Sequence, residues 1–181
     1  KFESQISKYT KSKYCIATVN GTSALHIALK VIGVKPNDEV LIPALNFISS
    51  ANATIYCGAT PHFVDVERET LGVDSDKLSD YLRKNTRSYN NFCINKRTNR
   101  VIRAIIPTHT FGHPFEIDKI ISLSKKYNLR VIEDAAESLG SFYKNKHTGT
   151  FGDIGILSFN GNKTVTTGGG GIILTNNKKY A

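Results

Sequence analysis

The sequence predicts a three-layer α/β/α domain in which helices cover both faces of a mostly parallel sheet. Short apolar segments alternate with helix-length amphipathic segments along most of the chain, and turn-forming residues separate them. The 181 residues are 40% hydrophobic and 22% charged, which is ordinary for a globular domain. A chain of this length can bury a full core, so we expect a single domain.

The first half of the chain contains three expected strands and four expected helices. The strands are expected at Tyr14–Val19, Glu39–Ile42 and His62–Val66. The helices are expected at Lys1–Tyr9, Thr22–Ile32, Ile48–Tyr56 and Ser75–Leu82. Gly33 and Gly58 follow two of these helices as C-terminal residues, and Asp74 precedes another as its N-cap.

The second half continues the alternation after one interruption. Lys84–Arg100 is polar and rich in turn formers, which indicates a surface loop or a small hairpin. A helix is expected at Glu116–Tyr127, where isoleucines recur at helical spacing, and another is expected to begin at Lys178. The remaining strands are expected at Arg103–Pro107, Leu129–Ile132, Ile154–Phe159 and Gly170–Thr175.

Two segments indicate a specific chemistry. Lys163 lies between the apolar run Ile154–Phe159 and the glycine stretch Gly168–Gly171, and Asp134 follows an earlier apolar strand. Ligands of such sheets bind at the carboxyl ends of strands, so we expect these groups and Asn20 to share one site. An amine and a carboxylate in one site suit pyridoxal 5'-phosphate, which needs a lysine for its aldehyde and an acid for its ring nitrogen.

Five segments in order resemble a known family. They are Asn20–Leu29, Leu41–Phe47, Gly58–Asp65, Ile105–Gly112 and the lysine segment Ser158–Gly171. Together they are similar to the DegT/DnrJ/EryC1/StrS sugar aminotransferases, which are fold-type I pyridoxal-phosphate enzymes. The resemblance implies that residues 1–181 are the cofactor-binding large domain, a fragment that lacks a C-terminal small domain.

The resemblance implies two catalytic residues. Lys163 would bind the cofactor covalently and later move a proton on the substrate, and Asp134 would pair with the protonated ring nitrogen. The alternatives are a surface lysine in a turn and an aspartate that caps a following helical turn.

The other cofactor-binding residues are also implied by the resemblance. Gly21, Thr22 and Ser23 begin a helix whose free N–H groups would hold the phosphate, and Ser158 would add a contact. Phe47 would stack on the ring. The alternatives are ordinary N-capping by Thr22 or Ser23 and a core position for Phe47.

The sequence leaves two roles open for Glu137. Many family members have His or Gln here, near the 3-hydroxyl of the cofactor. A glutamate accepts a hydrogen bond from a phenol but cannot donate one unless it is protonated. A structural role and a cofactor-facing role are therefore both retained.

Other motifs are negative or ambiguous. The glycines at Gly168–Gly171 lack the GxGxxG spacing of a dinucleotide site. The five histidines show no ligand spacing, so no metal is expected. His26 is interpreted as structural, whereas His109 follows a strand and is a candidate to approach the site.

Composition limits which binding partners and which cell compartment we expect. The net charge of +9 fits either attraction to phosphate groups or lysine-rich solvated helix faces, and no nucleic-acid motif accompanies it. No apolar run is long enough for a membrane span. Three cysteines without metal spacing indicate a reducing compartment, so we expect a cytoplasmic protein. The resemblance implies a homodimer.

The expected function is transamination of a nucleotide-linked 4-keto-6-deoxy sugar, with glutamate as the amino donor, in surface polysaccharide or glycan biosynthesis. Tyr56–Ala59, His109–Pro114 and the Lys84–Arg100 insertion resemble the branch that aminates UDP-linked sugars towards legionaminic acid. Three alternatives remain: a sugar dehydratase, which in this family has His in place of Lys163, a non-catalytic regulatory homologue, and a generic nucleotide-binding module.

Overall fold

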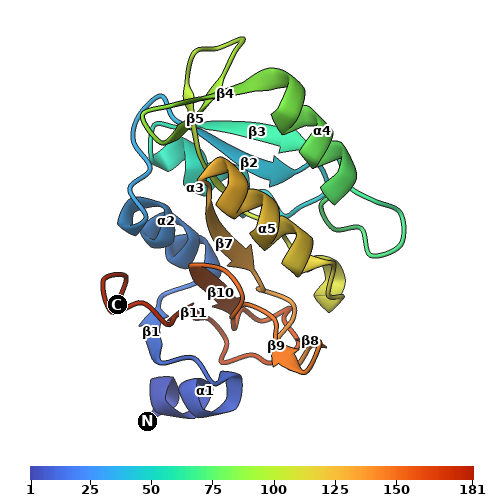
Figure 1. Ribbon diagram of the computed structural model, residues 1–181. Helices are drawn as coiled ribbons and strands as arrows, with labels where there is room; N and C mark the ends of the chain where they lie inside the picture. Colours follow the sequence, from blue (N-terminus) through green and yellow to red (C-terminus); the bar gives the residue numbers. More distant parts are fainter.

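The order of the strands determines where polar residues gather. The computed structural model describes residues 1–181 and contains a nine-stranded sheet with the main path β1-β11-β10-β7-β6-β2-β3 (Figure 1). These strands are β1 (Tyr14–Thr18), β2 (Glu39–Pro43), β3 (Thr60–Val64), β6 (Val101–Ile105), β7 (Arg130–Asp134), β10 (Ile154–Ser158) and β11 (Gly171–Thr175). Neighbours along the path are parallel, except that β11 is antiparallel to both β1 and β10. The carboxyl ends of the other strands therefore meet at one edge of the sheet.

Helices cover both faces of this sheet, which confirms the three-layer prediction. The helices are α1 (Phe2–Thr10), α2 (Gly21–Val31), α3 (Ser49–Tyr56), α4 (Ser75–Asn85) and α5 (Ile117–Tyr127). One core lies between α2, α3 and the sheet, and a second lies under α4 and α5. Successive residues of β2 alternate between them, because Val40 and Ile42 belong to the first core and Leu41 to the second.

The interruption at 84–100 is a hairpin, as one of the two alternatives predicted. β4 (Thr86–Tyr89) and β5 (Phe92–Asn95) are joined by Asn90 and Asn91, whose φ angles are 47° and 62°. Two positive φ angles in a two-residue connection match the twist of a hairpin, and asparagine tolerates them. The carboxylate of Glu39 fastens the hairpin to the sheet by accepting from Asn95 Nδ2 at 2.8 Å and from Thr98 Oγ1 at 2.5 Å.

Three expectations about elements need correction. β3 begins at Thr60 rather than His62, and Pro61 is tolerated there because β3 is an edge strand. The expected helix at Lys178 is only a turn, in which Tyr180 N donates to Asn177 O at 3.0 Å. β7 extends two residues beyond the expected end at Ile132, so Asp134 is its last residue.

Short elements near the sheet edge were not expected. They are the 3-10 helix η1 (Thr110–Gly112) and the hairpin of β8 (Phe142–Tyr143) and β9 (Lys146–His147). After the hairpin the chain passes against β10, where a Cβ on Gly155 would lie only 1.8 Å from Gly149 O. Glycine at position 155 therefore permits this close approach.

The three cysteines are free, and Cys57 and Cys93 are buried while Cys15 is half-buried. None of the helices has both the length and the apolar character needed to cross a membrane.

Candidate functional site

One cleft lies at the carboxyl ends of the strands. It has a volume of about 270 Å³, and its walls come from the start of α2, the loop before α3, the ends of β6 and β7, and the turn after β10. Of the residues named from sequence, Ser23 is the one that does not line it. The cleft brings together Gly21, Thr22, Phe47, Asp134, Glu137, Ser158 and Lys163.

The start of α2 is one wall of the cleft. The N-cap is Asn20, whose Oδ1 accepts from Ser23 N at 2.7 Å, so the alternative that Thr22 or Ser23 caps this helix is wrong. Ser158 lies against the helix start, because a Cβ on Gly21 would be 3.2 Å from Ser158 Cβ. A helix N-terminus with hydroxyl groups beside it favours an anion.

Lys163 extends into the cleft from the turn after β10. Its side chain is only 10% exposed, and its Nζ donates to Glu137 Oε1 at 3.2 Å. The same Nζ lies 5.5 Å from the centroid of the Phe47 ring. A surface lysine would be largely solvated, so that alternative is wrong.

Glu137 uses its two carboxylate oxygens differently. Oε1 holds Lys163, whereas Oε2 accepts from the backbone N–H of Phe111 at 3.1 Å. Its backbone carbonyl accepts from Thr164 Oγ1 at 3.3 Å. Glu137 thus joins the turn that carries the lysine to the loop after β6.

Asp134 is buried at the end of β7, with 3% of its surface exposed. Oδ2 accepts from Ser50 Oγ and Oδ1 from Ala136 N, each at 3.2 Å. A turn rather than a helix follows Asp134, and Oδ1 caps it through Ala136 N, so capping of a turn accounts for one of the two carboxylate oxygens. Burial raises the pKa of Asp134, and the two hydrogen bonds and the positive charge of Lys163 oppose this rise. A cationic partner in the cleft would therefore be favourable for this carboxylate.

Phe47 has 64% of its surface exposed, in the loop before α3. It is not a core residue, so the alternative suggested for it is wrong. Leu45 and Asn46 of the same loop also line the cleft. The ring therefore offers a flat apolar face beside the lysine amine.

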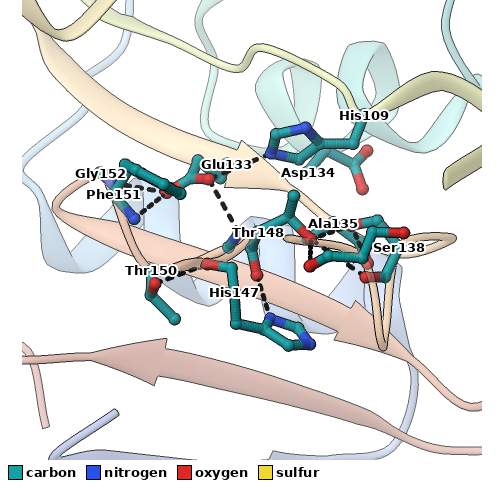
Figure 2. A network of polar contacts seen from close by, with 12 residues as sticks. His109, Glu133, Asp134, Ala135, Ser138, His147, Thr148, Thr150, Phe151 and Gly152 are labelled. Carbon is teal, nitrogen blue, oxygen red and sulfur yellow. Dashed lines mark hydrogen bonds and ion pairs between the residues drawn. The ribbon is translucent and has the colours of Figure 1, made fainter. Parts of the chain in front are cut away.

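Sequence reasoning missed Glu133, whose carboxylate lies between His109 and the loop at 149–152 (Figure 2). It accepts from the backbone N–H groups of Gly149, Phe151 and Gly152, and it contacts His109 Nε2 at 3.1 Å. His109 lines the cleft, as one interpretation of its position suggested, and is fully buried. The only sequence signal for Glu133 is a charged residue directly after the apolar pair Val131 and Ile132.

The arrangement defines what the cleft can do. An amine, a buried carboxylate, an anion-binding helix start and an exposed aromatic face surround one volume. Such a site can hold a flat, phosphorylated, nitrogen-containing ring and bond covalently to a carbonyl through the amine.

Comparisons with known proteins show which family the chain belongs to. The chain is 42% identical over 178 residues to a GDP-perosamine synthase from Escherichia coli O157:H7, which covers 98% of this chain and 44% of that protein. A DegT DnrJ EryC1 StrS aminotransferase from Brucella abortus superposes with a TM-score of 0.89 at 30% identity, covering 99% of this chain and 46% of the other. NtdA from Bacillus subtilis, solved with bound cofactor PMP, superposes with a TM-score of 0.82 at 32% identity, covering 99% and 37%.

This chain spans less than half the length of each of these proteins. The family model of the DegT/DnrJ/EryC1/StrS aminotransferases matches residues 1–181. The chain therefore belongs to the DegT/DnrJ/EryC1/StrS aminotransferase family.

Proposed function

We propose that residues 1–181 are the pyridoxal-phosphate-binding large domain of an enzyme that transfers an amino group from glutamate to a nucleotide-linked 4-keto-6-deoxy sugar. The observation that carries this proposal is the meeting of Lys163, Asp134 and the start of α2 in one cleft. Membership of a sugar aminotransferase family supports the reaction class. The share of the relatives that this chain spans supports its assignment as one domain of a longer enzyme.

The residues present fit the cofactor. Gly21, Thr22 and Ser158 would hold its phosphate, with Ser23 contributing to the helix that supplies the N–H groups. Phe47 would cover the ring. Asp134 would accept from the protonated ring nitrogen, because the buried carboxylate has only two hydrogen bonds and gains from a cationic neighbour. When bound, the cofactor supplies an electron sink and carries the amino group between the two substrates.

Lys163 would act through its Nζ. In this structure Glu137 Oε1 holds that atom at 3.2 Å, inside the cleft and away from bulk water. Once released from the cofactor, Nζ would take a proton from the donor substrate carbon and later return one to the sugar carbon. Glu137 would orient the amine between these events, and its Oε2 contact with Phe111 N fixes its own position.

The identity of the sugar is a separate part of the proposal. The name GDP-perosamine synthase belongs to a relative and supports a GDP-linked substrate, whereas the 84–100 hairpin supports the branch that uses UDP-linked sugars. A dehydratase is the second candidate because that chemistry occurs in the same family. Lys163 disfavours it, since those enzymes have histidine at this position.

We also propose a homodimer in the cytoplasm. The neighbouring helices α2 and α3 expose Ile27, Val31, Ile55 and Tyr56, and exposed apolar side chains of this kind suit contact with a second subunit. A non-catalytic homologue remains the outcome to be excluded, and mass spectrometry of the native protein would reveal whether cofactor is retained.

The test uses the full-length enzyme reconstituted with pyridoxal phosphate. Glutamate should convert the cofactor to its amine form and release 2-oxoglutarate, and keto sugars linked to UDP, GDP or dTDP should then regenerate the aldehyde. Residues 1–181 alone should give no turnover. Failure of glutamate and of every sugar to change the cofactor absorbance would contradict the proposal.

A further inference from the structure

The positive charge of the chain is concentrated in one segment. Residues 81–115 contain seven lysines and arginines and no aspartate or glutamate, whereas the rest of the chain has 17 basic and 15 acidic side chains. Five of the seven arginines of the protein lie in this segment. The planar guanidinium of arginine binds phosphate through two parallel N–H groups, so this composition favours a partner that carries phosphate groups.

Three of the seven cations are paired with carboxylates. Arg83 and Lys84 contact Asp80, and Arg103 contacts Asp38. The other four have no carboxylate partner, and they are Arg87, Lys96, Arg97 and Arg100. Their side-chain hydrogen bonds go to neutral oxygens, namely Asn99 Oδ1, Lys84 O and Thr60 Oγ1. The fold therefore leaves four neighbouring positive charges uncompensated.

These four cations lie away from the cleft. They belong to the β4–β5 hairpin and the turn after it, and β5 pairs with the first residues of β6, whereas the cleft lies at the carboxyl ends of the strands (Figure 1). The last turn of α5 lies beside the hairpin, because Asn128 Nδ2 donates to Asn91 O, and it adds two more cations. We call this set the basic surface, and it consists of Arg87, Lys96, Arg97, Arg100, Lys125 and Lys126.

Two exposed aromatic rings accompany the basic surface. Tyr89 and Phe92 lie directly opposite each other beside the hairpin connection, with 61% and 41% of their surfaces exposed. Because alternate residues of a strand share a face, Arg87 is on the same face as Tyr89. Exposed aromatic rings beside cations are typical of protein segments that lie on an anionic lipid surface, where the rings enter the headgroup region.

Nucleic acids and anionic lipids both present clustered phosphates. A single-stranded nucleic acid stacks successive bases on ring faces, but the guanidinium of Arg103 covers one face of the Phe92 ring at 4.7 Å from its centroid. A lipid surface needs no free ring face and binds cations that can reach one plane. We propose that the basic surface binds the anionic phospholipids of a membrane surface, with Tyr89 entering the headgroup layer.

The test measures sedimentation of the full-length enzyme with lipid vesicles. The parent should bind vesicles of phosphatidylglycerol mixed with phosphatidylcholine, and high salt should release it. The double variant Arg87→Gln/Arg97→Gln should bind them about tenfold or more weakly, because each cation near such a surface contributes to the affinity. The control Lys8→Gln/Lys13→Gln removes two exposed lysines near the N-terminus, at the other end of the molecule, and should bind like the parent (Figure 1).

Four outcomes would overturn the inference. They are no binding of the parent to the anionic vesicles, equal binding to vesicles of phosphatidylcholine alone, equal weakening by the control, and full binding by the arginine variant. Tighter binding of the parent to poly(U) RNA than to the anionic vesicles, at equal phosphate concentration, would also overturn it and would assign the surface to nucleic acid.

A second variant tests the contact without removing charge. The fluorescence of Tyr89→Trp, after subtraction of the parent spectrum, should shift to shorter wavelength with the anionic vesicles, and an unchanged spectrum would contradict entry of this residue into the headgroup layer. Pyridoxamine phosphate should bind all variants like the parent, because no residue of the basic surface lines the cleft. Failure of vesicle binding therefore leaves the proposed function intact, and failure of the proposed function leaves this inference intact.

Discussion

Glu133 and Asp134 are adjacent carboxylates at the end of β7, and both are buried. Glu133 accepts from three backbone N–H groups and from His109, so four donors offset the free-energy cost of burying its charge. Asp134 accepts from only Ser50 and Ala136, and burial raises its pKa. Glu133 therefore has four hydrogen-bond donors from within the fold, whereas Asp134 has two and lines a cleft.

The difference supports a structural role for Glu133 and the proposed binding role for Asp134. A fully paired buried carboxylate stabilises the conformation of the loops that supply its donors. An incompletely paired one retains a cost that a cationic ligand can offset. The same isosteric substitution at the two positions should therefore have opposite consequences.

Glu133→Gln should have the largest effect on stability. Each carboxylate oxygen of Glu133 accepts two N–H donors. In the Gln variant an NH₂ group replaces one of these oxygens, so two buried N–H groups lose their acceptor and lie against another donor. We expect the free energy of unfolding to fall by about 3–5 kcal/mol, measured by urea denaturation of the cofactor-free protein. A loss below about 1 kcal/mol would mean that the loop donors find other partners.

Asp134→Asn should instead affect binding. The amide oxygen can still accept from Ala136 N and the NH₂ can donate to Ser50 Oγ, so we expect the unfolding free energy to change by less than about 1 kcal/mol. Loss of the charge-assisted bond should weaken pyridoxamine phosphate about 10–100-fold, measured by calorimetry. Unchanged affinity would remove Asp134 from the cofactor site.

The pH dependence of stability should also distinguish the two residues. The pKa of Asp134 is raised in the folded state, so the folded protein holds this proton at a pH where the unfolded chain has released it. The contribution of Asp134 to stability should therefore fall as pH rises from the unfolded pKa near 3.8 to the raised folded pKa. Urea unfolding of the parent and Asp134→Asn at several pH values should show their difference changing with that sign.

His147 offers a smaller test within the fully paired region. Its Nε2 accepts from Gly140 N at 3.0 Å and its Nδ1 donates to Thr148 O, and burial lowers its pKa below 6.5. The unfolded ring binds a proton first as pH falls, so stability should decrease between pH 6.5 and the lower folded pKa. His147→Gln should flatten this part of the stability profile, and an unaltered profile would assign the slope to other groups.

The sequence predicts the residues that line the cleft better than it predicts the buried hydrogen bonds of Glu133 beside the cleft. Lys163, Asp134 and the start of α2 were found because each follows an apolar strand, and parallel strands bring their carboxyl ends together. The bonds of Glu133 join residues 16–24 positions apart through turns and two-residue strands, which have no periodicity to detect. Capping of α2 by Thr22 or Ser23 stayed open as an alternative because Asn20, Thr22 and Ser23 are all good caps, and the structure shows that Asn20 is the cap.

The most direct test of the account is the position of the covalent bond to the cofactor. Full-length enzyme incubated with pyridoxal phosphate and reduced with borohydride should carry one cofactor adduct, and peptide mapping should place it on Lys163. The Lys163→Ala variant should carry none, while the exposed-lysine control Lys144→Ala should be modified like the parent. An adduct that persists in Lys163→Ala, or that maps to another lysine in the parent, would contradict the account.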